Sequence, residues 1–188
     1  DKAANYDYMM CFFTGHGGSI RDQTYVQINN NQELFPQSSL ENLASRQLNI
    51  YDCCRSELET RGLMEFSDGL QAFASQMFTR QEARLIFERK IMAAKPQQLI
   101  LYSCAIKEYS YDESTGAMYL TSLLKDAVNH TNSQYIKGVK IALESHFNTI
   151  DTVRKKSGGK QNPDFRSPKF INHSDHLIIS ISSNKVDH

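Results

Sequence analysis

Short apolar runs alternate with longer segments of helical period along this chain of 188 residues, and few folds accommodate that alternation. Runs of only four or five residues favour strands over helices. The expected strands are Met9 to Phe13, Tyr25 to Ile28, Leu48 to Tyr51, Leu99 to Tyr102 and Leu177 to Ile181. We therefore expect one α/β domain over residues 1–188, a mainly parallel sheet with helices on both faces.

Several segments between these strands are predicted as helices or surface loops. The three long helices are Gln81 to Ala94, Gly116 to His130 and Lys137 to Lys156. The second helix carries its apolar side chains largely on one face, which should cover the sheet. A shorter helix, Gln37 to Arg46, should follow Pro36 with a serine as its cap. Weak periodicity predicts loops at 55–77 and 157–174.

The composition limits which binding partners and which cellular compartment we expect for this chain. Lys plus Arg and Asp plus Glu are equal at 21 each, so no net charge draws the chain to nucleic acid or to an anionic membrane. No apolar run reaches the roughly 20 residues that span a bilayer, although the chain starts with Asp1 and a targeting segment could precede it. The four cysteines mostly lie in or beside apolar runs, which favours a reducing cytoplasm. Their spacing predicts no metal and no cofactor.

Reactive residues follow two of the predicted strands. The first strand leads into Thr14, Gly15 and His16, and the third leads into Asp52, Cys53 and Cys54. Because ligands bind at the carboxyl ends of the strands in an open parallel sheet, a histidine and a cysteine there can meet.

A thiol and an imidazole together suit acyl transfer. A free thiol is only a few per cent ionised at neutral pH, and a nearby imidazole can take its proton and later return it to a leaving amine. Glycine beside His16 allows the backbone to approach a substrate, so the N–H groups of Gly17 and Cys54 are candidates for an oxyanion hole. From the residues alone, a core cysteine and an ordinary Gly-His-Gly loop remain alternatives.

The two motifs together resemble those of the caspase and metacaspase superfamily of cysteine peptidases. In that family one strand ends in Ser-Gly-His-Gly and a later one in Asp-Ser-Cys-His-Ser-Gly or Gln-Ala-Cys-Arg-Gly. The matching residues are Thr14-Gly15-His16-Gly17 and Asp52-Cys53-Cys54-Arg55-Ser56-Glu57. The resemblance implies a caspase-like fold, with Cys54 as nucleophile and His16 as general base. It continues through the segment 101–116 and through Gly158 to Pro163, a match to the Gly-x-Gln-x-Pro segment of bacterial members.

The resemblance also implies what the enzyme binds. Metacaspases place Asp two residues before the nucleophile and cleave substrates after Arg or Lys. By this resemblance Asp52 implies cleavage of a protein or peptide after basic residues. Thr14 would add a hydroxyl to the same pocket. A carboxylate in a partly desolvated pocket pairs well with a guanidinium. The segment from Cys104 to Tyr111, including Tyr109, would offer backbone to an extended substrate, as in β-strand addition.

The sequence departs from the family pattern in three places. The strand that precedes the histidine strand in the family is not in this chain, so an upstream segment or a sensor domain should supply it. Glu57 replaces a glycine. The Asp-rich calcium loop of many metacaspases is missing, so calcium dependence is not expected. Bacterial members often act in defence or programmed cell death, and this role is implied by analogy alone.

The alternatives are a caspase-like peptidase specific for Asp, an inactive caspase-like interaction module, and a thiol redox protein that uses the adjacent Cys53 and Cys54. Redox proteins more often use a Cys-x-x-Cys pair. If the chain is a protease for basic residues, self-cleavage after Arg61, Arg80 or Lys90 would mature it.

Overall fold

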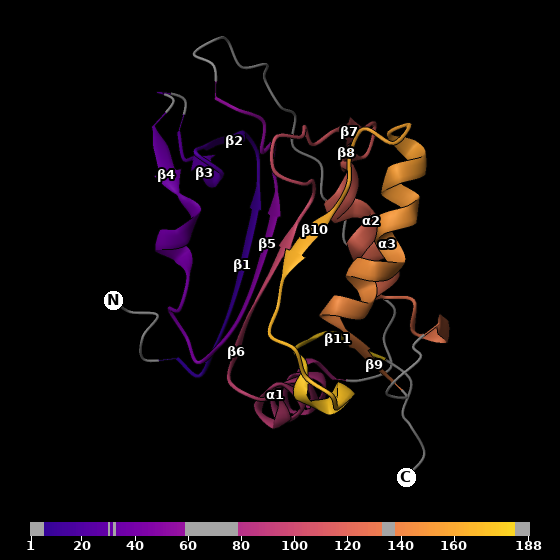
Figure 1. Ribbon diagram of the computed structural model, residues 1–188. Coiled ribbons are helices and arrows are strands. Elements are labelled where there is room, and N and C mark those ends of the chain that lie inside the picture. The colour runs from indigo at the N-terminus through magenta and orange to yellow at the C-terminus, as the bar shows by residue number, and fades with distance from the viewer. Residues whose placement is uncertain (1–5, 30, 32, 59–78, 133–137, 183–188) are drawn as a thin grey trace.

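The computed structural model describes residues 6–29, 31, 33–58, 79–132 and 138–182. At its centre lies a four-stranded sheet in the order β1-β5-β6-β10 (Figure 1). Strands β1 (Tyr8–Thr14), β5 (Arg46–Asp52) and β6 (Gln97–Tyr102) are parallel, and the short β10 (Asp164–Arg166) runs antiparallel to β6. The predicted α/β class with a mainly parallel sheet is confirmed.

Alternating side chains of the central strands fill two separate cores. Leu48 and Ile50 of β5 and the matching leucines of β6 face α2 (Met118–Ala127) and α3 (Ala142–Lys156). Tyr51 of β5 belongs to the core on the opposite face. Because successive side chains of a strand point to opposite faces, the next two residues, Asp52 and Cys53, leave the strand on opposite sides of the sheet.

The second face of the sheet departs from the prediction of helices on both faces. In the part of the chain that the structure describes, β2 (Gly17–Ile20), β3 (Gln23–Gln27) and β4 (Leu34–Pro36) form an antiparallel sheet that packs there with the 3₁₀ turn η2 (Gln37–Leu40). Helix α1 (Arg80–Ala93) packs near the amino ends of the central strands, against β11 (Ile178–Ile181). The two-residue strands β7 (Asp112–Glu113) and β8 (Gly116–Ala117) lie at the carboxyl ends (Figure 1).

The prediction of a helix from Gln37 to Arg46 was wrong. Only the 3₁₀ turn forms, and no serine caps it. The Gln37 side chain is buried and bonds to Glu41 and to the hydroxyl of Tyr102, which draws the segment onto the sheet. Asn42 then takes a φ of 56°, which a right-handed helix excludes.

Two other predictions need correction. The strands predicted at Tyr25 to Ile28 and Leu177 to Ile181 form, but outside the central sheet: the second pairs with β9 (Val139–Ile141). The helix predicted from Lys137 begins only at Ala142, because its first apolar residues are used by β9. The loop predicted at 157–174 contains β10, as well as the 3₁₀ turn η4 (His173–Asp175), and a further such turn, η3 (His130–Asn132), ends the α2 region.

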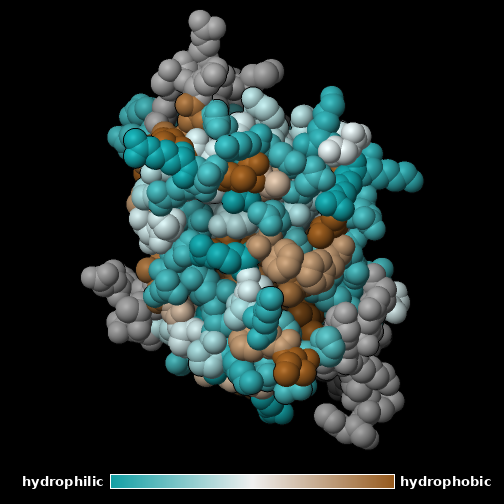
Figure 2. All heavy atoms as spheres, in the orientation of Figure 1, coloured by the Kyte–Doolittle hydropathy of each residue, from teal (hydrophilic) through white to brown (hydrophobic). Residues whose placement is uncertain are grey.

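Most of the surface in Figure 2 is hydrophilic. One of the apolar patches on this face lies over β10 and α3, where Phe147 and Phe165 are partly exposed and pack edge to face with ring centroids 5.2 Å apart. None of the helices in the described ranges is long and apolar enough to cross a membrane.

Leu99 and Leu85 test the assignment of the core. Leu99 is fully buried between the sheet and the helices, whereas Leu85 of α1 is 62% exposed. We expect Leu99→Ala to lower the free energy of unfolding by about 2–5 kcal/mol and Leu85→Ala to change it by about 0.5 kcal/mol or less. Chemical denaturation measures both values, and equal losses would contradict this core.

Candidate active site

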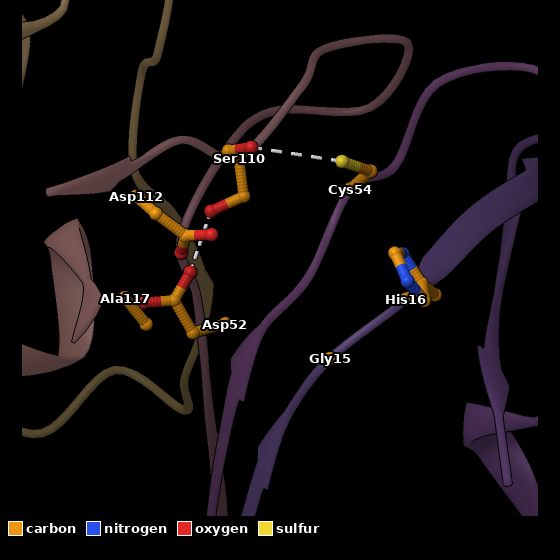
Figure 3. Close-up of a pocket in the computed structure, with 7 residues that line it drawn as sticks. All are labelled: Gly15, His16, Asp52, Cys54, Ser110, Asp112 and Ala117. Carbon is orange, nitrogen blue, oxygen red and sulfur yellow. Dashed lines mark hydrogen bonds between the residues drawn. The ribbon is translucent and has the colours of Figure 1, made fainter. Parts of the chain in front are cut away.

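A pocket opens at the carboxyl ends of β1 and β5, where the two motifs meet. It is lined by Gly15, His16, Asp52, Cys54, Ser110, Asp112 and Ala117, with an empty volume of about 290 Å³. His16 and Cys54 lie on one side, and Ser110, Asp112 and Asp52 lie opposite (Figure 3). Parallel pairing of β1 with β5, in which Thr14 stands opposite Asp52, brings the two strand ends to the same height. The structure therefore brings the predicted histidine and cysteine into one pocket.

The Cys54 side chain is half-buried, and its thiol donates a hydrogen bond to the carbonyl of Ser110, with 3.7 Å between Sγ and the oxygen (Figure 3). Burial raises the pKa of the Cys54 thiol above its ordinary value. Burial and the hydrogen bond that the thiol donates both favour the protonated thiol over the thiolate.

Cys53 and Cys54 point to different parts of the molecule. Cys53 lies in the core beside β3, and burial raises the pKa of its thiol. All four cysteines are free. Because one thiol of the adjacent pair is buried in the core and the other lines the pocket, the arrangement does not favour a vicinal redox pair.

Asp52 is almost fully buried at the base of the pocket, and its two carboxylate oxygens have different partners. Oδ1 accepts a hydrogen bond from the Ser110 hydroxyl at 2.5 Å, and Oδ2 accepts one from the backbone N–H of Leu120 at 2.7 Å. Helix α2 has no side-chain cap of its own at Ala117, so Asp52 supplies a distant acceptor for its first turn. Burial raises the pKa of Asp52, and these two hydrogen bonds oppose the rise.

Gly17 and Gly18 allow the backbone to pack closely against neighbouring segments, including the one that carries Cys53. A Cβ on Gly17 would lie 2.8 Å from the carbonyl oxygen of Tyr25 and 2.9 Å from Sγ of Cys53, and one on Gly18 would lie 2.4 Å from the Leu58 side chain. His16 pairs with Gln27 of the next strand, so the alternation of the ladder turns the N–H of Gly17 away from β3. The N–H of Ser19 points the same way and bonds to Ser56, just after Cys54.

The remaining predicted site residues differ in their positions. Thr14 is exposed and is not among the described residues that line the pocket. Cys104 is fully buried, and its Sγ contacts the carbonyls of Cys53 and Glu108, so its side chain is not placed to touch a ligand in the pocket. Tyr109 is 58% exposed beside the pocket segment.

Two polar residues of the pocket, Ser110 and Asp112, were not singled out from the sequence. Asp112 begins β7, and its pKa is raised by burial and lowered by the nearby His16. The predicted backbone segment, Cys104 to Tyr111, contains Ser110 and ends one residue before Asp112, and its loop sequence shows no periodic signal that would single out either side chain. The available signal was a Ser and an Asp in the connection between the strand Gln97–Tyr102 and the helix Met118–Ala127.

Arg55 follows Cys54 but is turned away from the pocket. Its guanidinium bonds to Thr24, to the carbonyl of Cys104 and to Asp164, and it lies 3.8 Å above the centre of the Tyr102 ring. Glu57, at the position of the family's glycine, instead forms an ion pair with Lys107. Within the described ranges, no three His, Cys, Asp or Glu side chains gather to hold a metal ion.

The sequence model of the caspase domain family, Peptidase_C14, matches residues 1–172 of the chain. No curated protein matches it. Among solved structures the chain is similar to the crystal structure of protein GSU0716 from Geobacter sulfurreducens, with 15% sequence identity and a TM-score of 0.49, over 93% of this chain and 70% of that chain.

The raised pKa of Cys54 predicts how its alkylation by iodoacetamide depends on pH. Because the thiolate is the reactive form, we expect modification of Cys54 to be slower than that of free cysteine at pH 7 and to accelerate into the alkaline range. Stopped samples analysed by peptide mass spectrometry would give the rate for each thiol. Buried Cys53 and Cys104 serve as internal controls that should stay unmodified in the folded protein. A Cys54 rate already at its plateau at neutral pH would contradict the assignment.

Proposed function

The chain belongs to the caspase domain family and is a caspase-like cysteine peptidase, and from this we propose that it cleaves peptide bonds after Arg or Lys with Cys54 and His16 as its catalytic pair. One observation carries the proposal. A single pocket holds a histidine, a cysteine and two carboxylates, Asp52 and Asp112. The first pair suits acyl transfer and the second suits a cationic side chain.

In the proposed reaction, Cys54 gives up its proton to His16 as Sγ attacks the scissile carbonyl carbon. The tetrahedral intermediate then collapses, the C–N bond breaks, and His16 returns the proton to the leaving amine. A thioester joins the acyl part of the substrate to Cys54. Water, deprotonated by His16, hydrolyses that thioester and restores the thiol.

The backbone N–H groups of Gly17 and Cys54 are proposed to hold the oxyanion. Two features support this role: the β2–β3 ladder turns the N–H of Gly17 away from β3, and Gly17 packs directly against Cys53. Preorganised N–H donors at such a position stabilise the charge that develops on the carbonyl oxygen.

The lining of the pocket supports a basic rather than an acidic residue before the scissile bond. The described residues that line the pocket include the carboxylates of Asp52 and Asp112 and neither Arg nor Lys. An aspartate-specific pocket needs a cation, and the nearest candidate in sequence, Arg55, is held by Asp164 and Tyr102 away from the pocket. Like charges would repel an acidic substrate.

A substrate in extended form is proposed to pair with the segment that runs from Cys104 to Tyr111. The Ser110 carbonyl faces Cys54, and the exposed ring of Tyr109 is free to contact neighbouring substrate side chains. Such pairing would displace the thiol from the Ser110 carbonyl. Main-chain hydrogen bonds would then give affinity, and the Asp52 pocket would give specificity.

The proposed partner and cellular location are supported by an edge strand of the central sheet and by the free cysteines. Among the described residues β1 is an edge of the central sheet, and its apolar sequence supports pairing with a strand from an upstream segment or sensor domain. Four free cysteines support a cytoplasmic location, and a role in bacterial defence or programmed cell death is proposed by analogy. Neither nucleic acid, a membrane nor a calcium ion is proposed as a ligand.

A panel of peptides that differ only in the residue before the cleaved bond tests the proposed specificity. We expect cleavage after Arg and Lys, no cleavage after Asp, and loss of activity by about 10²-fold or more in Cys54→Ala and His16→Ala. Asp52→Asn should reduce kcat/KM for the Arg peptide by about 10-fold or more. Rates of product release would be measured by chromatography. Cleavage after Asp alone would reject the pocket, and a folded wild type inactive on every peptide would favour an interaction module.

Self-cleavage is proposed to mature the enzyme after a basic residue of the segment that follows Cys54. Arg61 lies outside the described residues, Arg80 is the first residue of α1, and Lys90 lies inside that helix. Because a protease needs an extended chain, Lys90 is the least accessible of the three. We expect intact-mass spectrometry to find fragments of wild type that are absent from Cys54→Ala. Identical fragments in both proteins would contradict self-cleavage.

A further inference from the structure

Gln161 is fully buried, although it lies in the connection between α3 and β10. Gly158 and Gly159 have φ values of 62° and 81°, a left-handed conformation that reverses the chain after α3. The Ser157 hydroxyl accepts a hydrogen bond from the N–H of Gln161 and fixes the turn. The glutamine side chain then lies in the interior, against the pocket segment.

Three hydrogen bonds determine which way the Gln161 amide faces. Oε1 accepts from the backbone N–H of Tyr111 at 3.0 Å, and Nε2 donates to the carbonyl oxygen of Ser103 at 3.0 Å. Since an N–H can only donate and a carbonyl can only accept, the reversed amide would lose both bonds. The second N–H of Nε2 therefore points to the hydroxyl of Ser110, 3.2 Å away.

The direction of that bond sets the proton of the Ser110 hydroxyl. A hydroxyl has one proton, and because Ser110 Oγ accepts from Gln161, its proton is directed to Oδ1 of Asp52 at 2.5 Å. The backbone carbonyl of the same residue accepts the hydrogen bond from the Cys54 thiol, and Figure 3 shows Ser110 bonded to both Asp52 and Cys54. Gln161, Ser110 and Asp52 thus form one chain of hydrogen bonds.

We propose that Gln161 is a positioning residue that sets the specificity of the pocket by holding the Ser110 hydroxyl as a donor to the Asp52 carboxylate. The inference rests on the proposed preference for Arg and Lys, and it adds that the preference depends on a buried amide that does not line the pocket. Without Gln161 the hydroxyl can rotate, and the carboxylate loses the partner that holds it ionised and oriented toward the substrate cation.

Two peptides that differ only by Arg or citrulline before the cleaved bond give the readout, because citrulline has nearly the shape of Arg without its charge. We expect Gln161→Met to lower the ratio of kcat/KM for Arg over citrulline by about 10-fold, the size expected for one misaligned hydrogen bond to a charged group. The ratio does not depend on the amount of active enzyme, so partial unfolding does not imitate the effect.

Gln47 provides the matched control. It is also fully buried, and its amide bonds to Leu40 and Asn49, toward the amino end of β5. Gln47→Met should lower stability and leave the ratio unchanged. In a Ser110→Ala background, Gln161→Met should have little further effect on the ratio, since both changes break the same chain of bonds.

The outcomes separate this inference from the proposed function. A wild type that prefers Arg together with a Gln161→Met variant of unchanged ratio would overturn the role of Gln161 alone. Additive effects of Gln161→Met and Ser110→Ala would also overturn it. A wild type with no preference for Arg over citrulline would overturn the proposed specificity, and the role of Gln161 with it.

Discussion

The buried carboxylate of Asp52 is the constraint on which the active end of this fold depends. An ionised carboxylate is costly to bury unless its oxygens are hydrogen-bonded. Here one oxygen receives the Ser110 hydroxyl and the other receives the first turn of α2. A strand end, a loop and a helix start are thereby held together around one side chain, and the same side chain forms the base of the pocket.

Buried polar groups also hold the loops that form the rim of the pocket. The Arg55 guanidinium joins the segment after Cys54 to Thr24 of β3, to the loop after β6 and to β10. Glu108 accepts from Asn162, and the backbones of Arg55 and Glu108 bond to each other. These partners are far apart in sequence, so the rim forms only when the central sheet has assembled. Cys54 is positioned by this network rather than by its own strand alone.

Local patterns predicted the central part of the fold for a clear physical reason. A short continuous apolar run such as Leu48 to Tyr51 is buried on both sides only in a sheet that is covered on both faces. The apolar face of the second predicted helix is buried by packing on that sheet. Where tertiary contacts compete with local preference, the prediction failed. The Gln37 side chain is buried and accepts a hydrogen bond from the Tyr102 hydroxyl, and the first residues of the predicted third helix form a strand that pairs with β11.

By itself the sequence determined that a histidine and a cysteine follow two parallel strands, because chain direction sends the carboxyl ends of such strands to one edge. It also placed an aspartate two residues before that cysteine. Only the tertiary structure decided that Ser110, Asp112 and Gln161 would join them, and that Cys104 would be buried away from the pocket. Those positions depend on hydrogen bonds across more than 50 residues of chain, which no local spacing encodes.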